Sequence, residues 1–410
     1  MSWDNNIIKR IIDLDEQEKN KMKRIIYILI LIAITISNCT TPIIIPTTSA
    51  NSNLLVVEGI INAGSDSTII TLSRTVLVSA KTTVNPETKA TITVENATAT
   101  VGTLTETVKG TYASKGLNLD ITKQYRLRIK TSNGKTYASD LATPKITPPI
   151  DSLGYNITGT GLQIYVNAHD ATNNTRYYRY DYRETWQFHA AFQTGYISNG
   201  TALLNRTPAQ DIYSCFASDT TSNTILNSTA ALSQDVVYQF PIVSVVSSAE
   251  KIEQKYSILV QQVALTKDAY TFWDNLKKNT EELGGIFDAQ PSSIAGNIHN
   301  VNDATEPVIG YVSVGTVQKK RIYITRGQLP RSWALLDPYG CMVDTALINP
   351  PKVPNAPPEV RATLIVLPPQ GYAIFPFADA SMNIIGYMYT VPICADCTLR
   401  GTKTQPIFWK

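Results

Sequence analysis

Short runs of alternating apolar and polar residues dominate the chain from Leu54 onward. Runs such as LLVVEGIIN, STIITLSRTVLV, KATITVEN and YRLRIKTSNGKTYAS are separated by Gly, Asn, Pro and Ser, which favour turns. A period of two is typical of strands that bury one face. The pattern therefore predicts a mainly β protein, and the spacing of the first runs predicts an immunoglobulin- or fibronectin-like β-sandwich over residues 54–148.

Three local signals support this first domain. Asn133-Gly134 lies between two strand-like runs, and both residues tolerate the positive φ of a type I′ hairpin turn. Tyr125 stands at the head of its run, where a tyrosine corner of an immunoglobulin-like sandwich would lie. Prolines 144, 148 and 149 then predict a linker at the end of the domain.

Residues 149–410 read as a larger β-rich domain with one inserted helix. The strand-like runs include GLQIYVNAHD, TRYYRYDYRETWQFHA, ATLIVLPPQGYAIFPFADA and IIGYMYTVPI. Between them, residues 266–283 predict an α-helix with Thr266 as N-cap. Tyr270, Trp273 and Leu276 fall at helical spacing, which places them in the core more readily than on a ligand platform.

The N-terminal region has the order of an export signal. Basic Lys23-Arg24 precede an apolar run from Ile25 to Ile36, which is shorter than the ~20 residues of a membrane-spanning helix. Cys39 follows, as in a bacterial lipobox whose cysteine is acylated after cleavage. We therefore interpret residues 1–38 as a non-native extension plus signal peptide, with Met1 or Met22 as the start, and residues 39–53 as an acylated tether. The alternative is a short uncleaved anchor.

Export to an oxidising compartment favours disulfides among Cys215, Cys341, Cys394 and Cys397. A four-cysteine zinc site or a redox-active Cys394-x-x-Cys397 pair are the alternatives, although Cys215 and Cys341 form no second C-x-x-C knuckle. Three connectivities are possible. We favour distant partners for Cys394 and Cys397, because closing a C-x-x-C loop in extended chain is strained.

Charge and side-chain chemistry narrow the function classes. The chain carries 36 Lys and Arg against 33 Asp and Glu, and the part after residue 38 retains a net charge of +2, so we expect no nucleic-acid partner. Its 3 histidines stand in no familiar metal-binding spacing. The stretch GYVSVG around Ser313 has the wrong spacing for a nucleophile elbow and reads as a strand. We therefore assign no catalytic residue, metal or cofactor.

The stretch NNTRYYRYDYRETW is the strongest candidate for a binding surface. As a strand it would place Tyr177, Arg179, Asp181 and Arg183 on one face, and Tyr178, Tyr180, Tyr182 and Glu184 on the other. A solvated face or a structural ion-pair ladder is the plainer interpretation. The functional hypothesis is an aromatic and arginine surface for a sugar, a peptide or a partner loop. Its candidate residues are Tyr177, Arg179, Arg183 and Trp186.

The stretches YSILVQQVALT, IFDAQPSSIAGNI, VIGY and CADCTLRGTKTQPIFW, together with LLVVEGIIN, resemble the Bacteroidota lipoprotein family known as domain of unknown function 4249. The resemblance covers most of the chain after Cys39. It implies a non-enzymatic outer-membrane lipoprotein that accompanies a TonB-dependent nutrient transporter and reaches the membrane through its lipid. An exported hydrolase of glycan or peptide, or a structural or adhesive envelope protein, are the alternatives. The first acid after Cys39 is Glu58, which leaves surface and periplasmic orientation both open.

Overall fold

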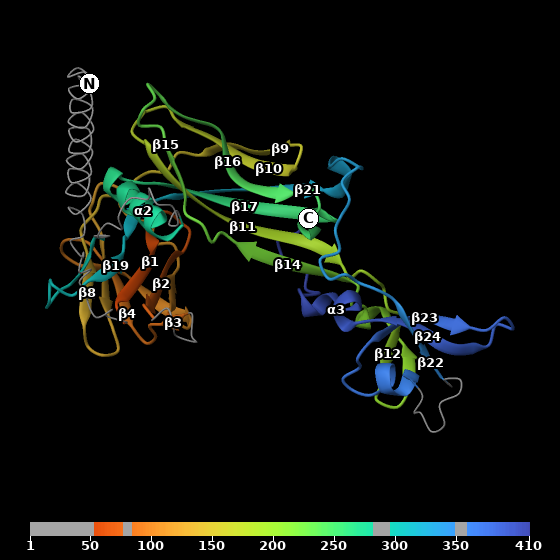
Figure 1. Ribbon diagram of the computed structural model, residues 1–410. Coiled ribbons are helices and arrows are strands. Elements are labelled where there is room, and N and C mark those ends of the chain that lie inside the picture. Colours follow the sequence, from red (N-terminus) through yellow and green to blue (C-terminus); the bar gives the residue numbers. More distant parts are fainter. Residues whose placement is uncertain (1–52, 77–83, 282–295, 349–358) are drawn as a thin grey trace, which may run out of the picture. The chain divides into compact units, whose positions relative to one another are not determined.

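A computed structural model describes residues 53–76, 84–281, 296–348 and 359–410 (Figure 1). Cys39 and the signal segment lie outside these residues. Strands form most of the ordered structure, so the prediction of a mainly β fold is confirmed. None of the helices in the described part of the chain combines the length and apolar character that a membrane crossing needs.

The first sheet has eleven strands. They are β1 (Leu55–Asn62), β2 (Thr68–Arg74), β3 (Asn85–Pro86), β4 (Thr91–Glu95), β5 (Thr100–Val108), β6 (Thr111–Ser114), β7 (Arg126–Lys130), β8 (Thr136–Ser139), β18 (Ile298–Asn300), β19 (Val308–Gly310) and β20 (Ser313–Gly315). The main path runs β18-β8-β7-β4-β5-β6-β2-β1-β19, with β20 also on β1 and β3 on β2.

One long strand joins the two halves of this sheet. The first half of β5 pairs with β4, and its second half pairs with β6. The strands therefore follow one continuous hydrogen-bonded path around a shared core that includes Ile70, Ile92 and Leu127. Two separate sheets, as an immunoglobulin-like sandwich requires, are not confirmed.

Two of the local predictions can be compared with the structure. The Tyr125 hydroxyl donates to the carbonyl of Asp120 at 3.1 Å, which is the contact of a tyrosine corner. A hairpin does join β7 and β8, but only Gly134 has positive φ, at 87°. The Gly134 amide donates to the Thr131 carbonyl at 2.9 Å, so the connection is a β-turn closed by a glycine and the predicted type I′ turn is wrong.

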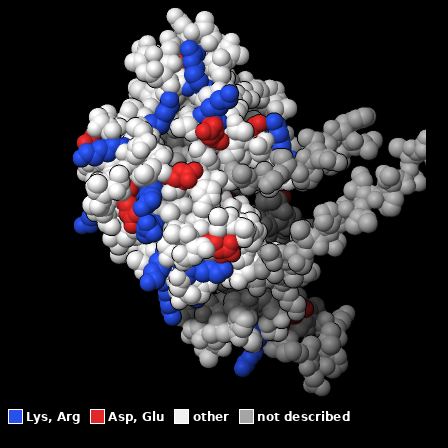
Figure 2. Space-filling model, turned by 90° about the vertical axis from the view of Figure 1, so that its left-hand side faces the viewer, with Lys and Arg blue, Asp and Glu red and all other residues white. Residues whose placement is uncertain are grey.

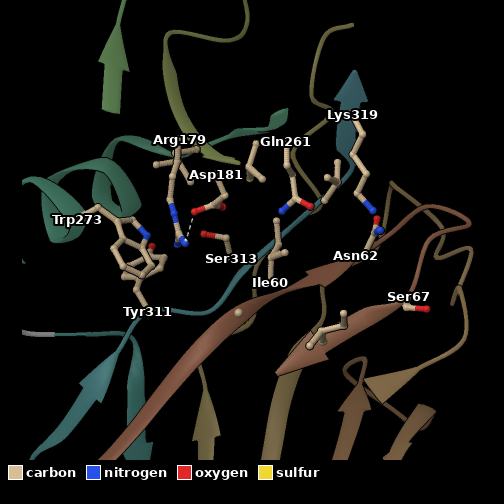
Figure 3. Close-up of a pocket in the computed structure, with 15 residues that line it drawn as sticks. Ile60, Asn62, Ser67, Arg179, Asp181, Gln261, Trp273, Tyr311, Ser313 and Lys319 are labelled. Carbon is tan, nitrogen blue, oxygen red and sulfur yellow. Dashed lines mark hydrogen bonds and ion pairs between the residues drawn. The ribbon is translucent and has the colours of Figure 1, made fainter. Parts of the chain in front are cut away.

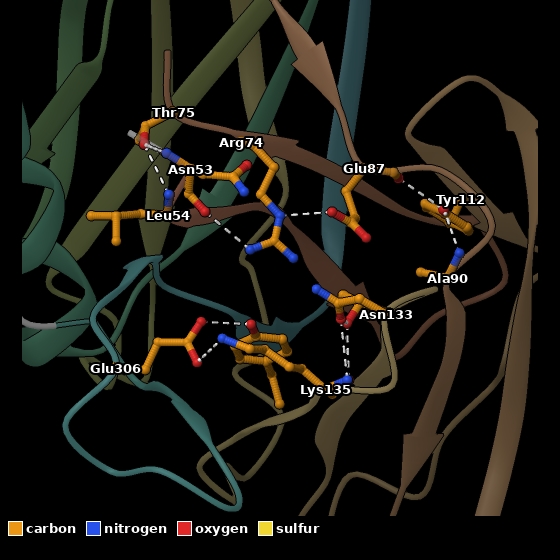
Figure 4. Close-up of polar contacts among 12 residues, drawn as sticks. Asn53, Leu54, Arg74, Thr75, Glu87, Ala90, Tyr112, Asn133, Lys135 and Glu306 are labelled. Atoms are coloured by element: carbon orange, nitrogen blue, oxygen red, sulfur yellow. Dashed lines mark hydrogen bonds and ion pairs between the residues drawn. The ribbon is translucent and has the colours of Figure 1, made fainter. Parts of the chain in front are cut away.

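Strands β18, β19 and β20 come from the region assigned by sequence to the second domain. β18 pairs with β8, whereas β19 and β20 run parallel to β1. Glu306, between β18 and β19, accepts hydrogen bonds from Lys135 and Tyr137, each at 2.8 Å (Figure 4). Burial alone would raise the pKa of Glu306, but these bonds outweigh it and hold the pKa below its ordinary value. The returning segment is thus fastened to the first sheet by charge as well as by strand pairing.

The next two sheets pack face to face. The five-stranded sheet contains β11 (Tyr177–His189), β14 (Ser214–Thr220), β15 (Ile225–Ser228), β17 (Lys255–Ala264) and β21 (Val317–Thr325). The three-stranded sheet contains β9 (Ile150–Ile157), β10 (Gly161–Asp170) and β16 (Asp235–Val246). Apolar side chains of both sheets, such as Ile164, Val166, Ile258 and Val260, form the core between them.

The predicted helix is present as α2 (Lys267–Thr280). The Thr266 hydroxyl accepts from the Ala269 amide at 3.2 Å, as an N-cap should. The helix ends at Thr280, and residues 282–283 of the predicted span lie outside the described residues. Ala269, Phe272 and Trp273 form its buried face.

The remaining elements form a smaller C-terminal lobe (Figure 1). Its strands are β12 (Tyr196–Ser198), β13 (Leu203–Asn205), β22 (Asp344–Leu347), β23 (Tyr372–Ala378) and β24 (Ile384–Thr390), with a short helix α3 (Pro392–Ala395). Single helical turns occur at Pro208–Gln210, Glu250–Ile252, Arg326–Gln328, Arg361–Ile365 and Cys397–Leu399. The turn at Arg361–Ile365 lies where the sequence pattern predicted a strand, so that local prediction is wrong.

Two disulfides fasten the C-terminal segment. Cys215 pairs with Cys397, and Cys341 pairs with Cys394, so each cysteine of the C-x-x-C motif has a distant partner, as the sequence favoured. Beyond them, the Trp409 ring packs edge-on against Phe216, with ring centroids 5.2 Å apart. The end of the chain is therefore tied to β14 by a covalent bond and by aromatic packing.

Candidate functional site

A cavity of about 170 Å³ lies where the first sheet meets the outer face of the five-stranded sheet. Figure 3 shows Ile60 and Asn62 of β1 on one side, with Arg179 and Gln261 reaching toward them from β11 and β17. Helix α2 closes one end with Trp273. The volume is below the range of drug-sized pockets, so the cavity suits a small ligand or one residue of a longer one.

Strand alternation puts a charged pair into this cavity. Tyr178 and Tyr180 of β11 point inward and are fully buried, which turns Arg179 and Asp181 outward. The Arg179 guanidinium lies 3.9 Å from the centroid of the Trp273 ring and donates to Asp181 at 3.0 Å. These contacts fix the orientation of Arg179 from two sides. We call Arg179, Asp181 and Trp273 the Arg179 cluster.

A break in strand pairing shapes the wall opposite the Arg179 cluster. β19 pairs with β1 up to Gly310, and β20 resumes pairing only at Ser313. Tyr311 therefore leaves the ladder, and its ring packs on Phe272 of α2 with centroids 5.6 Å apart. On the facing strand, Gly59 has φ 136°, and a Cβ there would lie 2.3 Å from a backbone oxygen. Only glycine fits that position.

Some polar groups of the cavity have no partner within the described part of the chain. The Ser313 hydroxyl is buried and makes no hydrogen bond there. The Gln261 amide also makes none among those residues. Lys319, by contrast, pairs with Asp66 at 2.7 Å. Since a buried hydroxyl without a partner costs roughly 1–3 kcal/mol, Ser313 is suited to bonding with a ligand.

A second cavity, of about 390 Å³, lies on the other side of the Arg179 cluster. Glu58 of β1, the turn at residues 221–224 and Glu281 at the end of α2 line it. The Glu281 carboxylate accepts from the Thr224 amide at 2.7 Å, which fastens this turn to the helix end. The two cavities share all three residues of the Arg179 cluster, so we treat them as one cleft.

The structure separates the four residues proposed from sequence as a binding surface. Arg179 lines the cleft, while the Tyr177 ring packs on Tyr270 at 4.9 Å. Arg183 lies exposed on the same face as Arg179. Trp186 belongs to the opposite face, where the Lys251 ammonium lies 4.9 Å from its ring centroid.

Glu184 shows why that opposite face is structural. It is buried and accepts from the Tyr256 hydroxyl at 2.7 Å and from Lys251 at 2.5 Å. Burial, reinforced by the Glu184 charge, raises the pKa of Tyr256 well above its ordinary value, so the phenol remains a donor. A buried carboxylate that already accepts from two donors within the protein is not available to a ligand.

A third cavity, of about 230 Å³, lies beside the Cys341–Cys394 disulfide. The His189 ring stacks on Tyr213 at 4.5 Å, and its Nδ1 lies 3.4 Å from the Glu253 carboxylate. Arg400 pairs with Glu250 in the same cavity. Across the described ranges, no group of three or more His, Cys, Asp or Glu residues is arranged to hold a metal ion.

Charge on the molecular surface is mixed. On the face shown in Figure 2, basic side chains lie among acidic ones, and neither sign covers a large area. This distribution follows from the near balance of 36 basic and 33 acidic residues.

Comparison with known protein families identifies the family of this chain. The profile of the domain of unknown function DUF4249 matches residues 40–321, which is more than half of the sequence. The chain belongs to the DUF4249 family. The resemblance inferred from sequence is thereby confirmed, and no curated protein matches the chain. The DUF4249 match includes every residue that lines the cleft and ends within β21, before β22, β23 and β24 of the C-terminal lobe.

Proposed function

We propose that this DUF4249 protein is a non-enzymatic binding lipoprotein of the outer membrane, and that it holds a small polar cargo for a TonB-dependent transporter. The cleft is the observation that carries the binding role. It combines a fixed Arg179 cluster with the side chains of Ser313 and Gln261, which make no hydrogen bond within the described part of the chain. A preorganised cation beside free donors and acceptors binds polar ligands with little reorganisation.

The cellular location rests on two further arguments. The order of basic, apolar and small residues before Cys39 supports export and acylation at that cysteine. The pairing of all four remaining cysteines is typical of proteins outside the cytoplasm. A lipid on Cys39 would anchor the protein without a spanning helix.

Native purification tests the role beside a transporter. An affinity-tagged protein should be isolated from membranes in mild detergent, with the Cys39→Ala variant as the matched control. We expect a TonB-dependent barrel to copurify with the wild type and to be lost with the variant, which should also leave the envelope fraction. Recovery of the wild type without any barrel would refute this role.

The same preparation separates the alternatives. Small molecules released from the wild type should be compared by mass spectrometry with those from a Gln261→Ala variant, which lacks the amide group that lines the cleft. Cargo recovered intact from the wild type, and depleted in the variant, supports binding without catalysis. Shortened products of an added glycan or peptide would favour the exported hydrolase. High abundance of the protein that persists unchanged after deletion of the transporter gene would favour a structural or adhesive protein.

A further inference from the structure

We propose that Arg183 and Arg321, on the exposed face of the five-stranded sheet, form an oxyanion subsite that binds a carboxylate of the cargo; this rests on the proposed binding role of the cleft. Both arginines lie on the face that carries Arg179. Arg183 and Arg321 flank Leu259 of β17, because each of the two is paired in register with that residue. We call these three residues the arginine shelf.

The spacing of strands places the two guanidinium groups on either side of one floor. Neighbouring strands lie about 4.8 Å apart, so the Cα atoms of Arg183 and Arg321 are about 10 Å apart across β17. Leu259 is partly exposed and provides an apolar floor between them. A carboxylate placed above Leu259 could accept hydrogen bonds from both arginines, whose planar groups match its two oxygens.

Neither arginine of the shelf has an acidic partner within the described ranges. Arg183 is exposed and makes no hydrogen bond or ion pair there. Arg321 donates to the Ser257 hydroxyl at 2.9 Å, and its guanidinium lies 3.6 Å from the centroid of the Phe408 ring. Burial lowers the pKa of Arg321, and the nearby charge of Arg183 lowers it further. An anion between them would relieve that repulsion.

The balance of charge on this face has the sign that an anion requires. From the cleft to the shelf, the described strands β11, β17 and β21 present Arg179, Lys319, Arg183 and Arg321 against Asp181. Glu58 and Glu281 line the second cavity, on the parts of the cleft formed by β1 and the end of α2. Asp181 is already engaged by Arg179, and Lys319 by Asp66. The uncompensated positive charge is therefore concentrated on the shelf. The ion pairs Arg179–Asp181 and Lys319–Asp66 in the cleft would bind the neutral part of a ligand, and the arginine shelf would bind its carboxylate.

The shelf directly adjoins the cleft. Gln261 and Lys319, which line the cavity, each stand two residues from a member of the shelf on their own strands. Residues two apart on one face of a strand lie about 7 Å from each other. A ligand the size of one sugar acid or one dipeptide can thus contact both Gln261 and Arg183.

Matched pairs of ligands test the proposal on the full mature protein. Glucuronate and glucose differ in a carboxylate, and so do diglycine and diglycinamide, which lets the two pairs distinguish a sugar acid from a peptide terminus as its source. Affinities should be measured by titration calorimetry at low salt. We expect the acid of at least one pair to bind about ten times more tightly than its neutral partner, and this preference to shrink at high salt.

Substitutions locate the effect. Arg183→Gln should abolish the preference for the acid without unfolding the protein, since Arg183 makes no hydrogen bond or ion pair within the described ranges. Arg321→Lys keeps the positive charge but loses the planar guanidinium that can donate two parallel hydrogen bonds, and it should weaken acid binding about threefold. Arg361→Gln, an exposed arginine of the C-terminal lobe, is the control and should change nothing.

The outcomes distinguish this inference from the proposed function. Equal affinity of the wild type for both members of both pairs would overturn the arginine shelf, and so would an unchanged preference in Arg183→Gln. Copurification with a transporter would still stand in that case. Conversely, an acid preference that depends on Arg183 would support the shelf even if no barrel copurified.

Discussion

Removing the Cys215–Cys397 disulfide should destabilise the protein more than removing Cys341–Cys394. The two bonds close loops with sequence separations of 182 and 53 residues. In the chain-entropy treatment these lengths correspond to about 5 and about 4 kcal/mol of stabilisation at 25 °C, as upper values. An intact Cys341–Cys394 bond shortens the path between Cys215 and Cys397 to about 130 residues, which lowers the first figure by only a few tenths of a kcal/mol because the dependence is logarithmic.

Packing around the two bonds adds to the difference. Cys215 and Cys397 are fully buried against Phe188 and Ala190, so loss of their sulfurs leaves a small apolar void. Cys341 is partly exposed and lies on a loop. Paired alanine substitutions avoid the cost of burying new hydroxyl groups, so we choose Cys215→Ala with Cys397→Ala, and Cys341→Ala with Cys394→Ala.

Urea unfolding followed by tryptophan fluorescence measures both variants under the same conditions. Trp409 belongs to the tail that Cys397 fastens, so it adds a signal from this tail to the emission of Trp186, Trp273 and Trp333. We expect a larger drop in the transition midpoint for the Cys215/Cys397 variant, with the slope compared to detect loss of two-state behaviour. Equal midpoints, or a larger effect at Cys341/Cys394, would refute the dependence on loop length and burial.

Three further predictions concern stability and should be measured by the same urea method. Glu306→Gln should lower the unfolding free energy at pH 7 by about 1–2 kcal/mol. Because the pKa of Glu306 in the folded protein lies below the ordinary 4.5, the wild type should lose this advantage as the pH falls through the folded-state pKa. A difference between wild type and variant that is as large at pH 3 as at pH 7 would contradict this prediction. Gly59→Ala should lower the unfolding free energy by more than about 2 kcal/mol. The control Gly159→Ala, whose added Cβ would have nothing within 4 Å, should lower it by less than about 0.5 kcal/mol. Similar losses for the two variants would contradict the steric argument. Thr266→Ala should cost about 1 kcal/mol through the lost N-cap, and a neutral result would show that α2 does not depend on it.

The parts of the fold that follow from local pattern were predictable. Period-two alternation correctly separated Tyr178 and Tyr180 from Arg179 onto opposite faces of one strand, because neighbouring side chains of a strand point in opposite directions. Thr266 was identifiable as an N-cap from its own side chain and the helical spacing after it. The hairpin at Gly134 was found, but its turn type was wrong because Asn133 tolerates positive φ without requiring it.

The cleft was only half predictable, since it depends on pairings between distant segments. Arg179 was proposed from its own strand, and Asp181 was placed on the same face without being proposed for the site. Gln261, Tyr311 and Ser313 were not assigned to a site. β19 and β20 pair with β1 across more than 240 residues of sequence, and short apolar runs carry no information about such partners.

The break between β19 and β20 links fold and site in one step. Continuous pairing along β1 would keep Tyr311 in the ladder, away from Phe272, and α2 would lose an aromatic contact near Trp273. Without Trp273 in place, the Arg179 guanidinium would keep only its hydrogen bond to Asp181, and its orientation would no longer be fixed from two sides. At Ser313, the first residue where pairing resumes, the same irregularity leaves the hydroxyl buried and without a hydrogen-bond partner among the described residues. Because strained or unsatisfied groups persist only where the surrounding structure enforces them, this break is the feature of the fold that most directly favours a ligand at the cleft.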